Sequence, residues 1–263
     1  MNTVRSKDGT EIALDRTGEG PPLILVGGAL SDRSAAAELA TLLAEHLTVY
    51  AFDRRGRGGS GDTLPYAVER EIEDLAALTA EAGGSVSLFG HSSGAALALE
   101  AAAHGVGCTK LALYEPPFII DDTRPPLPED YVAHLDELIA ADERGEAVAY
   151  FMTVGVGLPP EMVEGMRGAP MWPALEALAH TLGYDNRVMG DHMASEPLPV
   201  GEWSSVSMPT LVMDGDQSPP WQRNAVRTLA ELLPNAEYRT LEGQDHGASP
   251  EALAPVLVAF LGD

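Results

Sequence analysis

Cysteine is almost absent from this chain. Cys108 is the single cysteine in 263 residues, so no disulfide can form within the chain and the usual signature of an oxidising compartment is missing. The sequence also has no apolar stretch of signal-peptide length after Met1, and no run of about 18 apolar residues that would span a membrane. These absences predict a soluble cytoplasmic protein.

Basic residues are scarce as well. Lys and Arg together number 16 against 40 Asp and Glu, which gives a formal net charge of -24 at pH 7. Such a chain repels a polyanion, so nucleic acid is not an expected partner. The acidic residues are scattered along the chain rather than gathered in runs, which is typical of a well-solvated surface.

Motifs for metals and nucleotide cofactors are missing too. The chain has no His-x-x-x-His pattern and no paired cysteines, whereas a metal site needs a cluster of such ligands. Residues 56–59 read Gly-Arg-Gly-Gly after a predicted strand, but they do not continue into the Gly-x-Gly-x-x-Gly fingerprint of a dinucleotide site. We therefore expect neither a metal nor a cofactor.

Apolar periodicity predicts one α/β domain. Runs typical of buried strands alternate with segments of helical spacing, which favours a mostly parallel, doubly wound sheet. A short run at residues 12–14, followed after a Gly- and Pro-rich turn by residues 23–26, predicts a hairpin entering the sheet. The other predicted strands are residues 48–52, 86–89, 111–114, 210–213 and 237–241, and the predicted helices are residues 34–46, 69–82, 95–104, 222–233 and 250–261.

The alternation is interrupted once. Between residues 116 and 208 the pattern is largely helical, with Pro and Gly interruptions. We interpret residues 116–208 as a helical lid inserted into a core made of residues 1–115 and 209–263. The lid is rich in Met and aromatic side chains, which favours a hydrophobic small molecule as substrate. The alternative interpretation is that these side chains form the lid's own core.

The strongest local motif lies between a predicted strand and a predicted helix. Residues 90–94 read Gly-His-Ser-Ser-Gly, a Gly-x-Ser-x-Gly sequence in the context that a nucleophile elbow requires. The two glycines are needed because side chains there would collide with neighbouring backbone. The turn lifts the Ser92 hydroxyl clear of the sheet, and the N–H of Ser93 at the following helix N-terminus can stabilise an oxyanion. We interpret His91 as the variable position of the motif.

With this motif the chain resembles the α/β-hydrolase family over nearly its whole length. The resemblance implies the α/β-hydrolase fold, with Ser92 as nucleophile and His246, in the loop before the C-terminal helix, as general base. It also implies that Ala29, after Gly27 and Gly28, donates the second oxyanion-hole N–H; relatives often carry His where this chain has Gly27. The turn at residues 53–60 resembles the family's glycine-rich turn, and we interpret it as structural.

The acid of the triad departs from the commonest pattern. Where relatives usually carry Asp after the lid, this chain has Ser218. Some branches, among them zearalenone-type lactonases and certain haloalkane dehalogenases, place the acid at the end of the strand after the elbow, where Glu115 stands. Neighbouring strand tips are about 5 Å apart, so Glu115 can reach the same imidazole. Asp216 and Asp214 are the alternative acids.

These residues predict a serine hydrolase that cleaves a carboxylic ester or lactone through an acyl-enzyme. Two alternatives stay open. The same residues serve C–C hydrolysis, perhydrolysis or cyclisation on this fold, and fold alone does not decide among them. The chain is otherwise a ligand-binding protein that has kept the pocket of a hydrolase without turnover.

Overall fold

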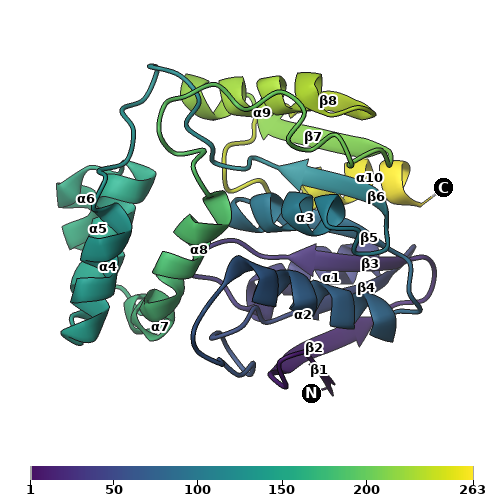
Figure 1. The fold of residues 1–263 in the computed structure, drawn as a ribbon, viewed down its shortest axis with the longest axis horizontal. Coiled ribbons are helices and arrows are strands. Elements are labelled where there is room, and N and C mark those ends of the chain that lie inside the picture. Colours follow the sequence, from purple (N-terminus) through teal and green to yellow (C-terminus); the bar gives the residue numbers. More distant parts are fainter. Residues whose placement is uncertain (1, 263) are drawn as a thin grey trace.

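The computed structural model describes residues 2–262, which form one eight-stranded sheet with helices on both faces (Figure 1). The strand order is β1-β2-β4-β3-β5-β6-β7-β8. From β4 across to β8 every neighbouring pair is parallel, and only β2 runs antiparallel to its neighbours β1 and β4, so the prediction of a mostly parallel, doubly wound sheet is confirmed. The strands are β1 (Asn2–Arg5), β2 (Glu11–Thr17), β3 (Pro22–Val26), β4 (Thr48–Phe52), β5 (Val86–His91), β6 (Cys108–Tyr114), β7 (Thr210–Gly215) and β8 (Ala236–Leu241).

The predicted hairpin between residues 12–14 and 23–26 is wrong. Strand β4 lies between β2 and β3, pairing antiparallel with β2 and parallel with β3. The true hairpin joins β2 to β1, a four-residue strand that the sequence pattern did not predict. The turn before β3 instead leads the chain across β4 to the centre of the sheet, where β3 lies beside β5.

The strands are apolar on both sides because helices cover both faces of the sheet. Alternate residues of β3 illustrate this, since Ile24 and Val26 belong to the core on one face and Leu23 and Leu25 to the core on the other. The first face carries α2 (Val68–Glu81), α3 (Ser93–Ala103) and α9 (Pro220–Leu232). The second carries α1 (Ala37–Leu43), preceded by the 3-10 turn Arg33–Ala36, and α10 (Pro250–Leu261).

The segment between β6 and β7 leaves the sheet and forms a group of short helices at the left of Figure 1. We call residues 116–208 the inserted segment. Its helices have their own buried apolar cluster, which includes Tyr131, Met152 and Trp172, and Ala29 and Leu30 of the core pack against it. The elements are α4 (Tyr131–Ala140), α5 (Arg144–Tyr150), the π-helical turn Phe151–Val156, α6 (Pro160–Met166), α7 (Trp172–Leu178), the 3-10 turn Ala179–Thr181 and α8 (Leu182–Met189).

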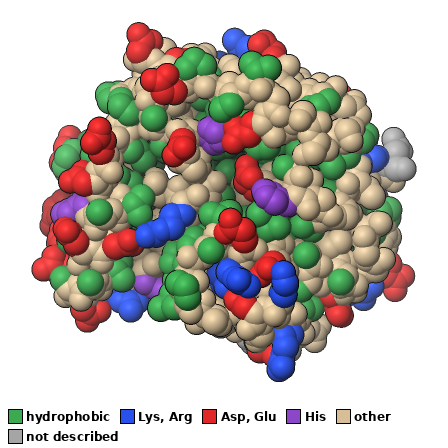
Figure 2. Space-filling view, viewed as in Figure 1, with side chains coloured by type: hydrophobic (Ala, Val, Ile, Leu, Met, Phe, Trp, Pro, Cys, Tyr) green, Lys and Arg blue, Asp and Glu red, His purple; other side chains and the backbone are tan. Residues whose placement is uncertain are grey.

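Acidic side chains are spread over the face drawn in Figure 2, with a few basic ones among them. Within residues 2–262 no helix has the length and apolarity needed to cross a membrane.

Candidate active site

Ser92 lies on a strained turn between β5 and α3. Its backbone has φ 58° and ψ -129°, a region that L-residues rarely occupy. Glycines on both sides make the turn possible: a Cβ on Gly90 would stand 2.4 Å from the Gly94 carbonyl oxygen, and one on Gly94 would stand 2.2 Å from that of Val26. A side chain at either glycine would therefore collide with neighbouring backbone, as the sequence motif predicts.

The structure brings Ser92, His246 and Glu115 together. His246 Nε2 lies 3.0 Å from Ser92 Oγ, and His246 Nδ1 lies 2.8 Å from Glu115 Oε2. The three residues come from the turn after β5, the loop between β8 and α10, and the end of β6. The distances allow a serine hydroxyl to donate to an imidazole whose other nitrogen donates to a carboxylate.

Glu115 is held from two sides at the tip of β6. Its side chain is fully buried, and Oε1 accepts the backbone N–H of Gly215 at 2.8 Å while Oε2 faces His246. Its backbone has φ 48°, unusual for a residue with a Cβ. Because β6 and β7 are adjacent in the sheet, the carboxylate reaches the imidazole from the strand next to the one on which relatives usually carry the acid.

The two alternative acids point elsewhere. Asp214 Oδ2 accepts from Tyr238 Oη at 2.7 Å and from Arg223 Nε at 3.1 Å. Asp216 Oδ1 accepts the backbone N–H of Gly243 at 2.8 Å. Ser218, at the usual acid position, is buried, and its hydroxyl has no hydrogen-bond partner within the described residues.

The two residues expected at the oxyanion hole flank Ser92. Ser93 is the first residue of α3, where backbone N–H groups have no helical partner. Ala29 follows Gly28, and a Cβ on Gly28 would stand 2.9 Å from the Cβ of Ser92. The loop after β3 therefore runs directly alongside the nucleophile elbow.

His91 has a contact that sequence reasoning missed. Its Nε2 lies 2.8 Å from the backbone carbonyl oxygen of His246, so the ring donates to the loop that carries the second histidine. Burial, and to a smaller extent the nearby His246 ring, lowers the pKa of His91 to about 4. The ring is therefore neutral at pH 7. No local pattern distinguishes this histidine from any other residue at the variable position of the motif.

Gln222 is a second missed neighbour of the imidazole. It is buried in the first turn of α9, and its Nε2 lies 2.6 Å from His246 Nδ1. When Nδ1 carries the proton that Glu115 accepts, Nδ1 cannot also accept from the Gln222 amide nitrogen. Rotation of the Gln222 amide by a half-turn places its carbonyl oxygen beside Nδ1, where the oxygen accepts from the same N–H. Glu115 and Gln222 then flank one N–H together.

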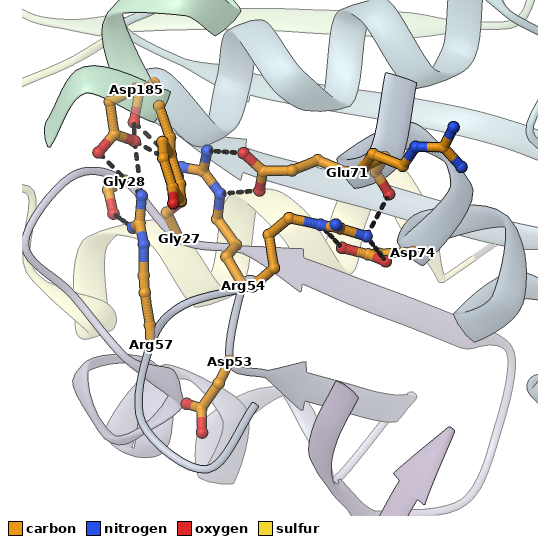
Figure 3. A network of polar contacts seen from close by, with 12 residues as sticks. Gly27, Gly28, Asp53, Arg54, Arg57, Glu71, Asp74 and Asp185 are labelled. Carbon is orange, nitrogen blue, oxygen red and sulfur yellow. Dashed lines mark hydrogen bonds and ion pairs between the residues drawn. The ribbon is translucent and has the colours of Figure 1, made fainter. Parts of the chain in front are cut away.

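The turn at residues 53–60, which we interpret as structural, is held by buried ion pairs. Arg54 and Arg57 are buried, and their guanidinium groups reach Glu71 of α2 and Asp185 of α8 (Figure 3). A signal was present, since three of the 16 basic residues fall within residues 54–57. Arginines in a buried turn require acidic partners, but the sequence does not say which ones.

Within the part of the chain that the structure covers, no group of three or more His, Cys, Asp or Glu side chains is arranged to hold a metal ion. The polar groups around Ser92 are instead paired with one another, as in the contacts of Glu115 and His246.

Comparison with known proteins finds hydrolases. A stretch of 104 residues is 39% identical to N-formylmaleamate deformylase from Pseudomonas putida and covers 38% of this chain and 39% of that protein. The structure of an alpha/beta hydrolase from Sphaerobacter thermophilus is 58% identical, covers 98% of this chain and 99% of that chain, and superposes with a TM-score of 0.92. An enol-lactonase from Burkholderia xenovorans shares the fold at 21% identity and a TM-score of 0.68, covering 100% of both chains.

Family membership follows from the extent of these matches. Residues 23–256 match the Alpha/beta hydrolase family, a span that runs from β3 into α10 and includes both Ser92 and His246. The chain therefore belongs to the Alpha/beta hydrolase family.

Proposed function

We propose that this protein is a serine hydrolase that cleaves a carboxylic ester or lactone of a hydrophobic small molecule. The observation that carries the proposal is the continuous chain of contacts from Ser92 Oγ through the His246 ring to Glu115, at 3.0 and 2.8 Å. Nucleophile, base and orienting carboxylate are all within hydrogen-bonding reach, which is the arrangement that nucleophilic catalysis by serine needs.

The first half of the reaction forms an acyl-enzyme. Ser92 Oγ attacks the carbonyl carbon while its proton passes to His246 Nε2, and the carbonyl oxygen becomes an oxyanion. Collapse of this tetrahedral intermediate breaks the bond to the leaving oxygen, which takes the proton back from the imidazolium. The carboxylate of Glu115 stabilises that imidazolium and holds its Nδ1–H in place.

The second half returns the free enzyme. Water attacks the acyl carbon, giving one proton to His246 Nε2, and a second tetrahedral intermediate collapses to a carboxylic acid and the Ser92 hydroxyl. With a lactone the alcohol and the acid remain one molecule. The backbone N–H groups of Ala29 and Ser93 are proposed to bind the oxyanion in both halves.

An apolar substrate is favoured by what lies beside the proposed oxyanion loop. Ala29 and Leu30 pack against the apolar cluster of the inserted segment. A substrate carbonyl at Ser92 would therefore have hydrophobic side chains of the inserted segment near one side.

The test is turnover of a panel of aryl esters, aliphatic esters and lactones by the wild type and by Ser92→Ala. We expect turnover by the wild type and none by the variant, with a fluorophosphonate probe labelling Ser92 of the wild type only. A protein that binds esters without turnover or labelling would instead be a ligand-binding relic. Turnover that survives in Ser92→Ala would overturn the serine mechanism.

Cleavage of an N-formyl amide is the second candidate. It is favoured by the 39% identity to a deformylase over 104 residues, and it needs the same attack on a carbonyl carbon with nitrogen as the leaving atom. Including N-formyl amides in the panel separates the two. A kcat/KM for N-formyl amides above that for every ester and lactone would assign the protein to amide cleavage.

A further inference from the structure

Four charged side chains form a closed, buried group beside Ser92. Arg54 donates from Nε and Nη2 to the two carboxylate oxygens of Glu71, each at 2.7 Å, and from Nη1 to Asp185 at 2.7 Å. Arg57 donates from Nη2 to both oxygens of Asp185 at 2.8 Å. All four side chains are at most 5% exposed. Two positive and two negative charges therefore balance inside the protein (Figure 3).

The charges of Arg54, Glu71 and Asp185 are stabilised by their partners, whereas burial and the neighbouring Arg54 lower the pKa of Arg57. Burial alone would raise the pKa of Asp185, but Arg57 and Arg54 lower it below its ordinary value. Burial likewise opposes the charge on Arg54, yet Glu71 and Asp185 raise its pKa. Asp185 is thus an anion at neutral pH, and it is the one member of the group that comes from the inserted segment, on α8.

Both arginines donate hydrogen bonds to backbone carbonyl oxygens of the loop after β3. Arg57 Nη1 donates to the carbonyl oxygen of Gly28 at 2.5 Å, and Arg54 Nη1 donates to that of Gly27 at 3.2 Å. The carbonyl of Gly28 and the N–H of Ala29 belong to the same planar peptide group and point in opposite directions. Fixing the Gly28 oxygen therefore fixes the direction of the Ala29 N–H. A cation on that oxygen also polarises the peptide, which makes the N–H a stronger donor.

Asp185 reaches the other side of Ser92 as well. Its Oδ1 accepts the hydroxyl of Ser93 at 2.7 Å, while both of its oxygens hold Arg57. Ser93 and Ala29 are the two donors that the proposed function assigns to the oxyanion. One carboxylate of α8 thus connects to both of them, directly on one side and through Arg57 on the other.

We propose that Asp185 and Arg57 are positioning residues that orient the oxyanion-hole N–H of Ala29. Packing of α8 against the core then completes the oxyanion hole. The proposal rests on the proposed function. On this proposal the inserted segment contributes a positioning residue to the active site and does not only cover it. Both side chains are assigned an indirect role, through the peptide at Gly28 and through Ser93.

The experiment compares Asp185→Asn with the wild type on a p-nitrophenyl ester, with kcat and KM measured separately. A trifluoromethyl ketone, whose adduct with Ser92 carries an oxyanion, serves as the transition-state probe. We expect kcat to fall about 10²-fold, as for loss of one oxyanion donor. The inhibition constant of the ketone should rise by a similar factor while KM changes little.

A matched control is available in the same turn. Arg55 and Asp74 form a buried pair with contacts of 2.7 and 2.8 Å, and neither reaches Gly27, Gly28 or Ser93 through any hydrogen bond within residues 2–262. Asp74→Asn should therefore lower stability without changing the ratio between the ketone constant and KM. An equal fall in kcat and in ketone affinity for Asp74→Asn would reduce the role of Asp185 to stability and overturn the proposal.

Two further variants keep the test decisive if Asp185→Asn does not fold. The double variant Arg57→Met with Asp185→Asn removes one charge of each sign and leaves the Arg54 and Glu71 pair, while Ser93→Ala removes only the hydroxyl that donates to Asp185 and accepts from Arg54. Folded variants with unchanged kcat and ketone affinity would refute the positioning role alone. A wild type that neither turns over esters nor is labelled at Ser92 would remove the proposed function itself.

Discussion

His91 donates from Nε2 to the backbone carbonyl oxygen of His246 at 2.8 Å, although the two residues are 155 positions apart in the sequence. The first belongs to the nucleophile elbow and the second to the loop after β8. Tyr114, at the end of β6, makes a second hydrogen bond to the same loop, because its hydroxyl donates to the carbonyl oxygen of Asp245 at 2.5 Å. The position of the imidazole beside Ser92 therefore depends on side chains of β5 and β6 that hold its backbone.

Loss of the His91 contact should loosen the His246 loop and lower kcat. For His91→Leu we expect a fall of up to about 10²-fold, because misplacing a catalytic group by about 1 Å has an effect of that size. His91→Gln, which can still donate from its amide, should recover part of the loss. Steady-state kinetics on an aryl ester measure the difference. His104→Leu, at an exposed histidine that directly follows α3, is the control, and a comparable loss there would refute the explanation.

The low pKa of His91 predicts acid sensitivity of the fold. Its folded-state pKa of about 4 lies below the ordinary 6.5. Between these values an unfolded chain binds a proton that the folded chain does not, so the free energy of unfolding decreases as the pH falls through this window. The decrease is at most roughly 3 kcal/mol, and partial contact of the ring with solvent reduces it.

Replacement of the imidazole removes this contribution. In urea unfolding at pH 7, 5.5 and 4.5, the stability of His91→Gln should decline less steeply than that of the wild type. Parallel curves for the two proteins would mean that His91 does not control the acid limb of stability.

If Glu115 rather than Asp216 is the orienting acid, replacing each carboxylate by an amide should change kcat very differently. In Glu115→Gln the carbonyl oxygen would keep the bond from the Gly215 N–H, which turns the amide nitrogen toward His246 Nδ1. That donor favours the tautomer with the proton on Nε2, where it cannot accept from Ser92. We expect kcat to fall by about 10⁴-fold.

Asp216→Asn is the matched control, because its carboxylate contacts the Gly243 N–H rather than the imidazole. It should leave kcat close to the wild-type value. Both variants are measured with the same ester, and a larger loss in Asp216→Asn would move the acid to the loop after β7.

Much of the fold could be predicted because it follows from local patterns. Strand β4 and helix α10 begin and end at the predicted residues, since their apolar runs are bounded by clear polar or proline signals. The hairpin error has a different origin. Two short apolar runs joined by a turn look alike whether they pair with each other or with a third strand, and β4 intervenes only through pairing at long range.

The candidate site divides in the same way. Ser92 and its flanking glycines are a local requirement of one tight turn, so the sequence motif carries them. The partners of Arg57 and His91 lie 128 and 155 residues away, at Asp185 and His246. Only the packing of α8 and of the loop after β8 brings them together. A buried arginine predicts that an acid exists, whereas the fold decides which acid it is.

The closeness of Gly28 to Ser92 makes a single methyl group a sensitive probe of the loop after β3. A Cβ at Gly28 would stand 2.9 Å from the Ser92 Cβ and 3.2 Å from the His91 carbonyl oxygen. Gly28→Ala must therefore push the loop away from the elbow and carry the Ala29 N–H with it. We expect kcat to fall by about 10²-fold, and the free energy of unfolding to fall by roughly 1–3 kcal/mol because of the overlap.

Gly165 in α6 is the matched position, because a Cβ there meets nothing within 4 Å. Gly165→Ala should leave kcat unchanged and stabilise the protein by up to about 1 kcal/mol, since alanine favours the helix. Ester turnover and urea unfolding of the two variants separate a local steric effect from a general effect of replacing glycine. Wild-type kcat in folded Gly28→Ala would mean that the loop after β3 does not contribute to the oxyanion hole.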